Sequence, residues 1–397
     1  MRGFDRTGFD AQATAAAIHR VCETAQKHAA SCDEAAEFPL AALEEMRRTG
    51  LLGLMVPTAH GGMGGGVDDV LDAGIALGRV DMSVAMIFTM HCQQVAGIVR
   101  HASPRLVAEL LPEIAAGRLY LASVTTEAGK GGHLLTSAAE LATEDDRLVI
   151  DRVAPIVTGG AHADGFLITM LSPTARSPHE VSLVYAHRDQ LDIGVSGDWD
   201  PLGMRASHSV ALKLTGQVPG HQVVGEHGQF RKVVLDTFGP LAHLGWAATW
   251  LGTAAGALSR VLHTLRSPAG RKSANLDSEL LLTRLSRARQ RLDTVHALLR
   301  HTAATLSQAA DAGDDLSRPR YQLLVNALKI TASEECHRTV EDLVDAVGLR
   351  HGYLKSSPTG LERALRDLRS AALNYSNDRL HLADGRLALL DAEVSFA

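Results

Sequence analysis

One stretch of the chain, residues 119–224, lacks the helical spacing of apolar residues that is present on both sides of it. It contains short apolar runs rich in β-branched residues, at 147–150, 166–171 and 181–185, separated by Gly, Pro, Asp and Ser. Such runs between turn-forming residues are typical of strands. The sequence therefore predicts a β domain inserted in the middle of a helical protein.

The flanking regions carry apolar residues at the three-to-four spacing that forms one face of a helix. We expect helices at 10–30, 40–49, 67–77, 83–101, 104–116, 233–266, 276–310, 321–347 and 361–390. The glycines of the 233–266 helix are expected to allow close helix packing. The predicted domains are an N-terminal helical domain over 1–118, a middle β domain over 119–225 and a C-terminal helical bundle over 226–397.

Composition places the chain among soluble globular proteins, with 46% hydrophobic and 21% charged residues in 397. A net charge of -6 argues against a nucleic-acid partner. The four cysteines are far apart, and the 19 histidines form no metal-binding motif, so we expect reduced thiols and no metal. The start has no apolar signal segment and no apolar run is long enough for a bilayer, so we expect a cytoplasmic protein without a membrane partner.

Five motifs resemble, in order, those of one enzyme family. Residues 56–64 (VPTAHGGMG) resemble P-x-x-x-G-G-x-G, and residues 126–132 (TEAGKGG) resemble T-E-P-G-x-G-S. Residues 156–164 (IVTGGAHAD) resemble W-I-T-N-G-x-x-A-D, and residues 202–209 (LGMRASHS) resemble L-G-x-R-x-S-x-S. Residues 362–367 (ERALRD) resemble E-R-x-x-R-D. The chain thus resembles the acyl-CoA dehydrogenase superfamily over about residues 10 to 391.

The resemblance implies a helical N-terminal domain, a β-barrel-like middle domain and a C-terminal four-helix bundle, assembled as a homodimer or homotetramer. It implies FAD as the cofactor, with FMN as the alternative. Thr125 and Thr126 would bond the pyrimidine end of the flavin ring, and Thr158 would lie beside its N5 atom. Gly131 and Gly132 belong to the same cofactor-binding motif as Thr126. Neutral donors at these places would stabilise the reduced ring.

The sequence departs from the family at both positions where a glutamate can act as the base. Counting from the E-R-x-x-R-D motif places the common site on Tyr375, and counting from the first long C-terminal helix places the other on Ala242, next to His243. A shift of one or two helical turns would instead bring Asp378 or Asp236 into play. The adenosine-binding R-x-x-F-G motif is reduced to RSPAG at 266–270.

A missing carboxylate removes the means of abstracting a proton next to a thioester. Some members of the superfamily accept reduced flavin from a reductase and use O2 to oxygenate a substrate, without that glutamate. Several carry a His just before the lost glutamate, where this chain has Asn374. Asn374 and Tyr375 are therefore the candidate catalytic residues, through hydrogen bonds to a hydroperoxide or a substrate. The alternative is that both are structural residues of a helix that continues over 374–379.

Three functions remain open at this point. We favour a reduced-flavin monooxygenase, served by a flavin reductase, acting on a small organic or carrier-bound substrate. The second is an acyl-thioester dehydrogenase with a non-standard base, and the third is a flavin-free scaffold or binding protein.

Overall fold

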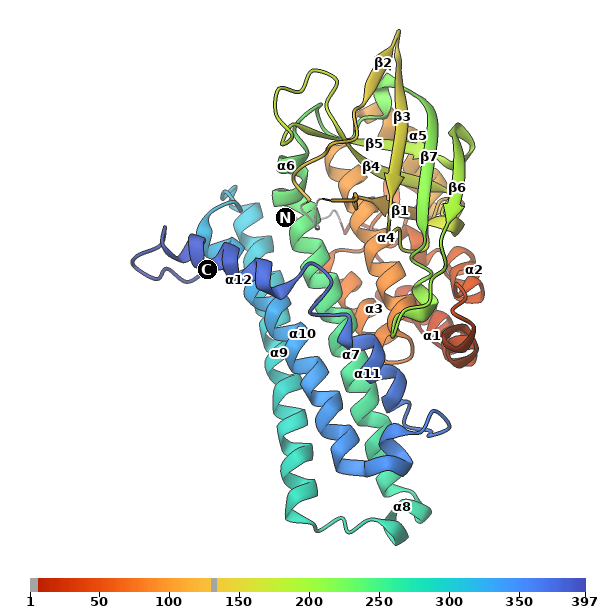
Figure 1. Cartoon of the computed structure of the whole chain (residues 1–397), viewed down its shortest axis with the longest axis vertical. Helices are drawn as coiled ribbons and strands as arrows, with labels where there is room; N and C mark the ends of the chain where they lie inside the picture. The colour runs from red at the N-terminus through yellow and green to blue at the C-terminus, as the bar shows by residue number, and fades with distance from the viewer. Residues whose placement is uncertain (1–5, 130–133) are drawn as a thin grey trace.

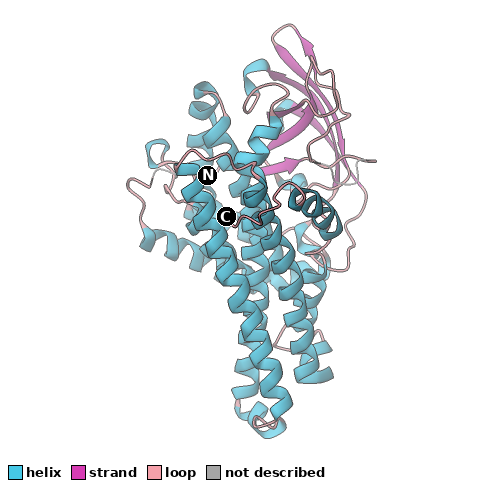
Figure 2. Ribbon diagram, turned by 90° about the vertical axis from the view of Figure 1, so that its left-hand side faces the viewer, coloured by secondary structure: helices cyan, strands magenta, loops and turns pink. Residues whose placement is uncertain are grey.

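The computed structural model describes residues 6–129 and 134–397. Helices occupy both ends of the chain and strands its middle, as the sequence predicts. Figure 1 shows long helices forming the body of the molecule with the strands gathered at its upper end, and Figure 2 shows the same arrangement from the side. The predicted mainly helical chain with a central β region is confirmed, whereas the domain limits at 118/119 and 225/226 stay predictions.

From residue 6 onward, five α-helices precede the strands: α1 (Ala11–Ala35), α2 (Leu40–Thr49), α3 (Val67–Gly78), α4 (Met82–His101) and α5 (Pro104–Ala115). The Asp81 carboxylate caps α4 by accepting the backbone N–H of Val84. Among the described residues, α4 is the one helix long and apolar enough to cross a membrane, yet 89% of its apolar window is buried inside the protein. It is therefore a core helix of this fold.

In the part of the chain that the structure describes, seven strands form two sheets: β1 (Leu121–Val124), β2 (Ala142–Glu144), β3 (Arg147–Ala154), β4 (Gly165–Leu171), β5 (Val181–His187), β6 (Leu191–Ser196) and β7 (Ala211–Pro219). The sheet orders are β1-β4-β5 and β2-β3-β7-β6. β1 runs parallel to β4, and the other neighbours are antiparallel. Buried and less buried residues alternate along β3, as the predicted half-buried strand requires, whereas β4 and β5 are buried almost throughout.

The C-terminal helices are α6 (Phe230–Val233), α7 (Gly239–Arg266), α8 (Pro268–Ser273), α9 (Glu279–Asp311), α10 (Pro319–Gly348), α11 (Leu361–Arg369) and α12 (Asn377–Ala388). α7, α9 and α10 run side by side in Figure 1. The predicted close packing by glycines occurs between α7 and α3. A Cβ on Gly252 would lie 2.3 Å from the carbonyl oxygen of Ile75, so a larger residue would separate the two helices.

Two predicted helices are interrupted in the structure, and both interruptions face the candidate site. The predicted helix at 233–266 contains a π-helical turn, Val234–Phe238, just before Pro240. Because proline has no N–H and crowds the carbonyl four residues earlier, the regular helical pattern fails there. Gln93 of α4 donates from Nε2 to the carbonyl oxygen of Phe238 at 2.8 Å, which stabilises the turn.

The prediction of one helix over 361–390 is wrong, because α11 and α12 are separated by turns at 370–376. Tyr375 has φ +52°, a backbone conformation that ends a right-handed helix and is uncommon for a residue other than glycine. Lys329 of α10 donates from Nζ to the carbonyl oxygen of Tyr375 at 2.9 Å. Contact with a distant helix therefore overrides the local helical spacing.

Candidate functional site

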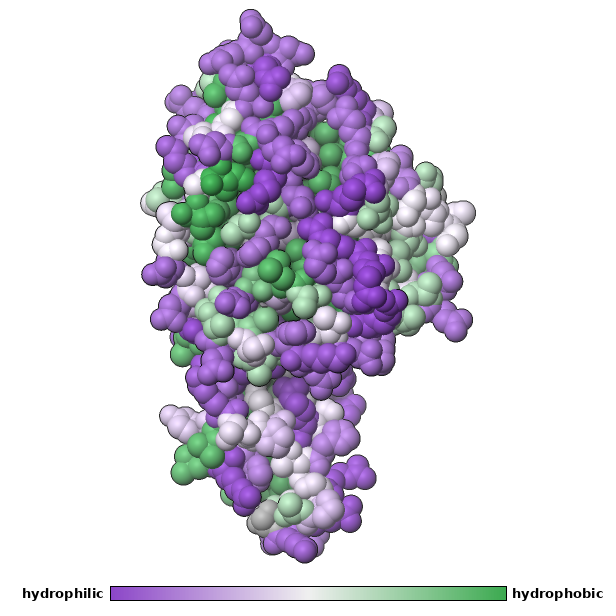
Figure 3. Space-filling view, turned by 90° about the vertical axis from the view of Figure 1, so that its right-hand side faces the viewer, coloured by the Kyte–Doolittle hydropathy of each residue, from purple (hydrophilic) through white to green (hydrophobic). Residues whose placement is uncertain are grey.

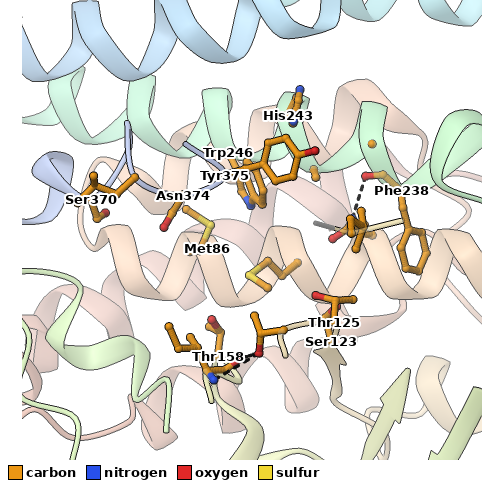
Figure 4. A pocket seen from close by; sticks show the side chains of 18 of the residues that line it. Met86, Ser123, Thr125, Thr158, Phe238, His243, Trp246, Ser370, Asn374 and Tyr375 are labelled. Carbon is orange, nitrogen blue, oxygen red and sulfur yellow. Dashed lines mark hydrogen bonds between the residues drawn. The ribbon is translucent and has the colours of Figure 1, made fainter. Parts of the chain in front are cut away.

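A cavity of about 650 Å³ lies between the strand region and the helices α4, α7, α10, α11 and α12. Figure 4 shows Ser123, Thr125 and Thr158 on its β side and Tyr375, Trp246 and His243 on its helical side. The cavity brings together Thr125, Thr126, Thr158, Asn374 and Tyr375, which are the predicted site residues within the described chain. The other two, Gly131 and Gly132, lie outside the described residues.

The β side presents a chain of hydroxyl groups. Ser209 donates from Oγ to Oγ1 of Thr158 at 3.0 Å, and Ser207 lies 2.9 Å from Ser209. Since Ser209 uses its proton on Thr158, Ser207 donates to Ser209. The hydroxyl proton of Thr158 is then free to be donated into the cavity, because no described residue accepts it. The motifs at 156–164 and 202–209 thus meet in the structure, and together they direct the Thr158 hydroxyl to donate into the cavity.

The loop that carries Thr125 and Thr126 is held by a buried ion pair. Arg152 is 1% exposed, lies 3.3 Å from the Glu127 carboxylate and donates to the carbonyl oxygen of Thr126 at 2.8 Å. Burial lowers the pKa of Arg152 to about 10, so the guanidinium stays charged at neutral pH. Thr126 donates its own hydroxyl to the carbonyl oxygen of Ile156 at 2.7 Å. That hydroxyl therefore joins two cavity loops, and a ligand would have to share it.

The helical side is largely apolar and lacks a carboxylate. No Asp or Glu lines the cavity among the described residues. Ala242 and Tyr375, the two positions where a base was sought, both line it. Asp236 and Asp378, the alternatives from a shifted alignment, do not. The lining therefore supplies no carboxylate base from any of these four positions.

The two titratable groups nearest those positions are poor bases at neutral pH. Burial and the neighbouring Lys329 ammonium lower the pKa of His243 to about 4. Burial raises the pKa of Tyr375, so its phenol keeps its proton. Neither group has a pKa near neutrality, where general bases are most effective.

Arg366 and Arg369 line the cavity, and the first of these arginines is paired with acidic neighbours. Arg366 lies 2.6 Å from Asp33 and 2.9 Å from Glu362, and these contacts bind its guanidinium from both sides. Beside it, burial raises the pKa of Asp367 to about 7, and its carboxylate accepts the backbone N–H of Met204 at 2.6 Å. The ion pair with Asp33 joins α11 to α1, and the hydrogen bond between Met204 and Asp367 joins α11 to the loop at 202–205 on one side of the cavity.

Several residues that shape the site could not be singled out from the sequence. Ser207 and Ser209 were recognised only as part of a motif, although their hydroxyl-rich spacing was a usable signal. Lys329 carried no signal, since its partner Tyr375 is 46 residues away. As for metals, the described residues contain no group of three His, Cys, Asp or Glu side chains that could hold one.

Comparisons with known proteins agree with this architecture. A family model described as the N-terminal domain of acyl-CoA dehydrogenase matches residues 10–118, and one described as the C-terminal domain matches residues 244–378. Together they match more than half of the chain.

Both a monooxygenase and a probable acyl-CoA dehydrogenase are similar to this chain. Dibenzothiophene monooxygenase of Mycolicibacterium goodii is 25% identical over 349 residues, covering 83% of this chain and 82% of the relative. Probable acyl-CoA dehydrogenase FadE25 of Mycobacterium tuberculosis is 24% identical over 368 residues, covering 91% and 90%.

Solved structures share the fold. FMN-bound TdsC from Paenibacillus sp. A11-2 superposes with a TM-score of 0.85 at 23% identity, covering 97% of this chain and 98% of TdsC. Butyryl-CoA dehydrogenase from Megasphaera elsdenii superposes with a TM-score of 0.82 at 17% identity, covering 96% and 99%.

The fold and these matches define a flavin-dependent oxidoreductase. The chain belongs to the acyl-CoA dehydrogenase superfamily. The enzyme class is thereby favoured over the flavin-free scaffold, and FAD or FMN is the expected cofactor. The donor set fits a flavin ring, because Thr158 offers a neutral hydroxyl and Thr125 lies on the same side of the cavity.

Proposed function

We propose that this protein is a monooxygenase that uses reduced flavin and O2 to oxygenate a small, largely apolar substrate. The observation that carries the proposal is the absence of a carboxylate from the described lining of the cavity, at both positions where the family places its base. Similarity to dibenzothiophene monooxygenase and to TdsC supports it. When bound, reduced flavin supplies the electrons that place one oxygen atom of O2 on the substrate and release the other as water.

In this proposal the protein's own residues bind the flavin, orient the substrate and shield the reacting groups from water. Thr158, directed by Ser209, donates a hydrogen bond to the flavin ring, and the loop held by Arg152 positions Thr125 and Thr126 beside it. Met86, Phe238 and Trp246 line the cavity and limit water around the reacting groups. Asn374 and Tyr375 come from the turn between α11 and α12 and contact the substrate.

The alternative is an acyl-thioester dehydrogenase with a non-standard base. Similarity to acyl-CoA dehydrogenases keeps this alternative open. It would require His243 or Tyr375 to remove a weakly acidic proton, and the pKa values of both groups oppose that role.

Two experiments separate these functions. Under anaerobic conditions, acyl thioesters are expected to leave the absorbance of the bound oxidised flavin unchanged. With reduced flavin, O2 and an aromatic substrate, we expect an oxygenated product that carries one atom of 18O from 18O2. Rapid anaerobic bleaching by an acyl thioester would instead establish the dehydrogenase.

Replacing Thr158 with valine is expected to weaken flavin binding by about twofold to tenfold, since one hydrogen bond contributes about 0.5–1.5 kcal/mol. Titration of the flavin-free protein with FAD and FMN, followed by absorbance or calorimetry, measures the loss and shows which flavin binds more tightly. Thr143→Val, at an exposed position of β2, serves as the control. Equal affinity of wild type and Thr158→Val would remove Thr158 from the flavin site.

We further propose a cytoplasmic homo-oligomer, a dimer or tetramer, that receives reduced flavin from a separate reductase. Four large apolar side chains near the C-terminus are exposed: Leu389, Leu390, Val394 and Phe396. On the face shown in Figure 3, by contrast, apolar patches are interspersed with hydrophilic side chains. Exposed apolar side chains that lie close in sequence favour a subunit contact at this end. A monomeric mass in solution by light scattering would contradict it.

A further inference from the structure

The side chain of His243 is fixed in one tautomer by its position on α7. The residue is 8% exposed, and its Nδ1 lies 3.4 Å from the carbonyl oxygen of Val325 on α10. A carbonyl oxygen accepts and cannot donate, so Nδ1 carries the proton. Nε2 is then left with a lone pair, and no described residue donates to it. Figure 4 shows His243 on the helical side of the cavity, beside Tyr375.

The surroundings keep this imidazole neutral. Burial is the larger cause of its low pKa, about 4, and the Lys329 ammonium adds to it. At neutral pH the ring is therefore a hydrogen-bond acceptor at Nε2 and carries no charge.

Two aromatic side chains that line the cavity pack beside His243, and such rings favour an aromatic ligand. The ring centroid of His243 lies 5.6 Å from that of Trp246 and 6.2 Å from that of Tyr375. Two amides in the same lining already donate elsewhere: Asn326 to the Asp384 carboxylate and Gln322 to the carbonyl oxygen of Leu316. Nε2 of His243 is therefore a hydrogen-bond acceptor that neither amide occupies, on a largely apolar wall.

We propose that His243 selects the substrate by accepting a hydrogen bond from it, and that the substrate class is small aromatic molecules bearing an N–H or O–H group. This inference rests on the proposed function for the reaction, but the binding preference itself does not depend on flavin. A substrate without a donor would leave the Nε2 lone pair desolvated and unpaired, which costs binding. His243 is thus a specificity-determining residue at the wall opposite Thr158.

Indole and benzothiophene test the inference, because they have nearly the same shape and differ by N–H in place of sulfur. Calorimetric titration of the full-length protein, with and without oxidised flavin, is expected to show indole binding about fivefold to tenfold more tightly. Equal affinities in the wild-type protein would overturn the inference even if no variant folds. Failure of the protein to bind flavin would instead overturn the proposed function while leaving this comparison measurable.

Two variants assign the preference to His243. His243→Phe keeps a flat ring without an acceptor and is expected to reduce the indole-to-benzothiophene ratio to about one. His243→Gln retains an acceptor oxygen and is expected to restore part of the ratio. His19→Gln, on the exposed surface of α1, is the control and is expected to leave the ratio unchanged. An unchanged ratio in His243→Phe, or an equal loss of both ligands, would show that His243 serves structure only.

Discussion

Replacing Lys329 with methionine is expected to release the turn between α11 and α12 and to lower kcat/KM at least about tenfold, which corresponds to about 1.4 kcal/mol. Lys329 is fully buried, and its Nζ donates to the carbonyl oxygen of Tyr375 at 2.9 Å and to Oδ1 of Asn377 at 2.7 Å. Methionine fills a similar volume but donates nothing. The carbonyl oxygen of Tyr375 then loses its Lys329 donor, and Oδ1 of Asn377 keeps only the longer contact, 3.4 Å, with Oγ of Ser333. An unsatisfied buried acceptor costs about 1–3 kcal/mol.

Removal of a buried charge offsets part of that cost. Burial lowers the pKa of Lys329 to about 8, which means that the fold disfavours the ammonium. We therefore expect a net loss of about 2 kcal/mol in the free energy of unfolding. The larger effect is expected on kcat/KM, because the backbone that positions Asn374 and Tyr375 is no longer held in place.

Urea unfolding, steady-state kinetics and limited trypsin digestion measure the three consequences of Lys329→Met. We expect faster cleavage after Arg369 or Arg379, which flank the released turn. Lys355→Met, at an exposed position, is the control and is expected to change stability by less than about 0.5 kcal/mol. Wild-type kinetics and an unchanged digestion pattern in Lys329→Met would show that the turn holds its shape without this lysine.

Replacing Gly203 with alanine is expected to separate the loop at 202–205 from α11. A Cβ at Gly203 would lie 2.1 Å from the carbonyl oxygen of Arg366 and 2.6 Å from the backbone nitrogen of Asp367. Both are backbone atoms and cannot rotate away, so the loop must move. The movement would break the hydrogen bond from the Met204 N–H to Asp367.

We expect Gly203→Ala to lose about 2–4 kcal/mol of stability, from overpacking together with the lost hydrogen bond. Flavin and substrate binding are expected to weaken as well, because Gly203 and Met204 line the cavity. Urea unfolding and flavin titration measure these changes. Gly385→Ala is the matched control: nothing lies within 4 Å of its Cβ, and alanine favours the helix α12 by about 0.5–1 kcal/mol. If both variants were as stable as the wild type, the contact at Gly203 would be looser than the structure has it.

The β side of the site was predictable because its residues occur in local motifs. Thr158 and the serines at 207 and 209 each lie in a short recognisable motif, although only the pairing of β3 with β7 brings Thr158 and Ser209, 51 residues apart, into contact. The helical side was less predictable. The spacing of apolar residues indicates one helix at 361–390. It contains no information on the buried lysine of another helix that contacts Tyr375, so the break that carries Asn374 and Tyr375 was not predicted.

The sequence by itself determined the order of helices and strands, the β insert and the family, because hydrophobic period and short motifs are local properties of the chain. Tertiary structure alone decided which side chains share the cavity. It directed the hydroxyl of Thr158 inward, tied that of Thr126 to Ile156 and left one nitrogen of His243 without a partner among the described residues. The physical reason is that hydrogen bonds and burial depend on distances between residues far apart in the chain, and one-dimensional spacing does not contain those distances.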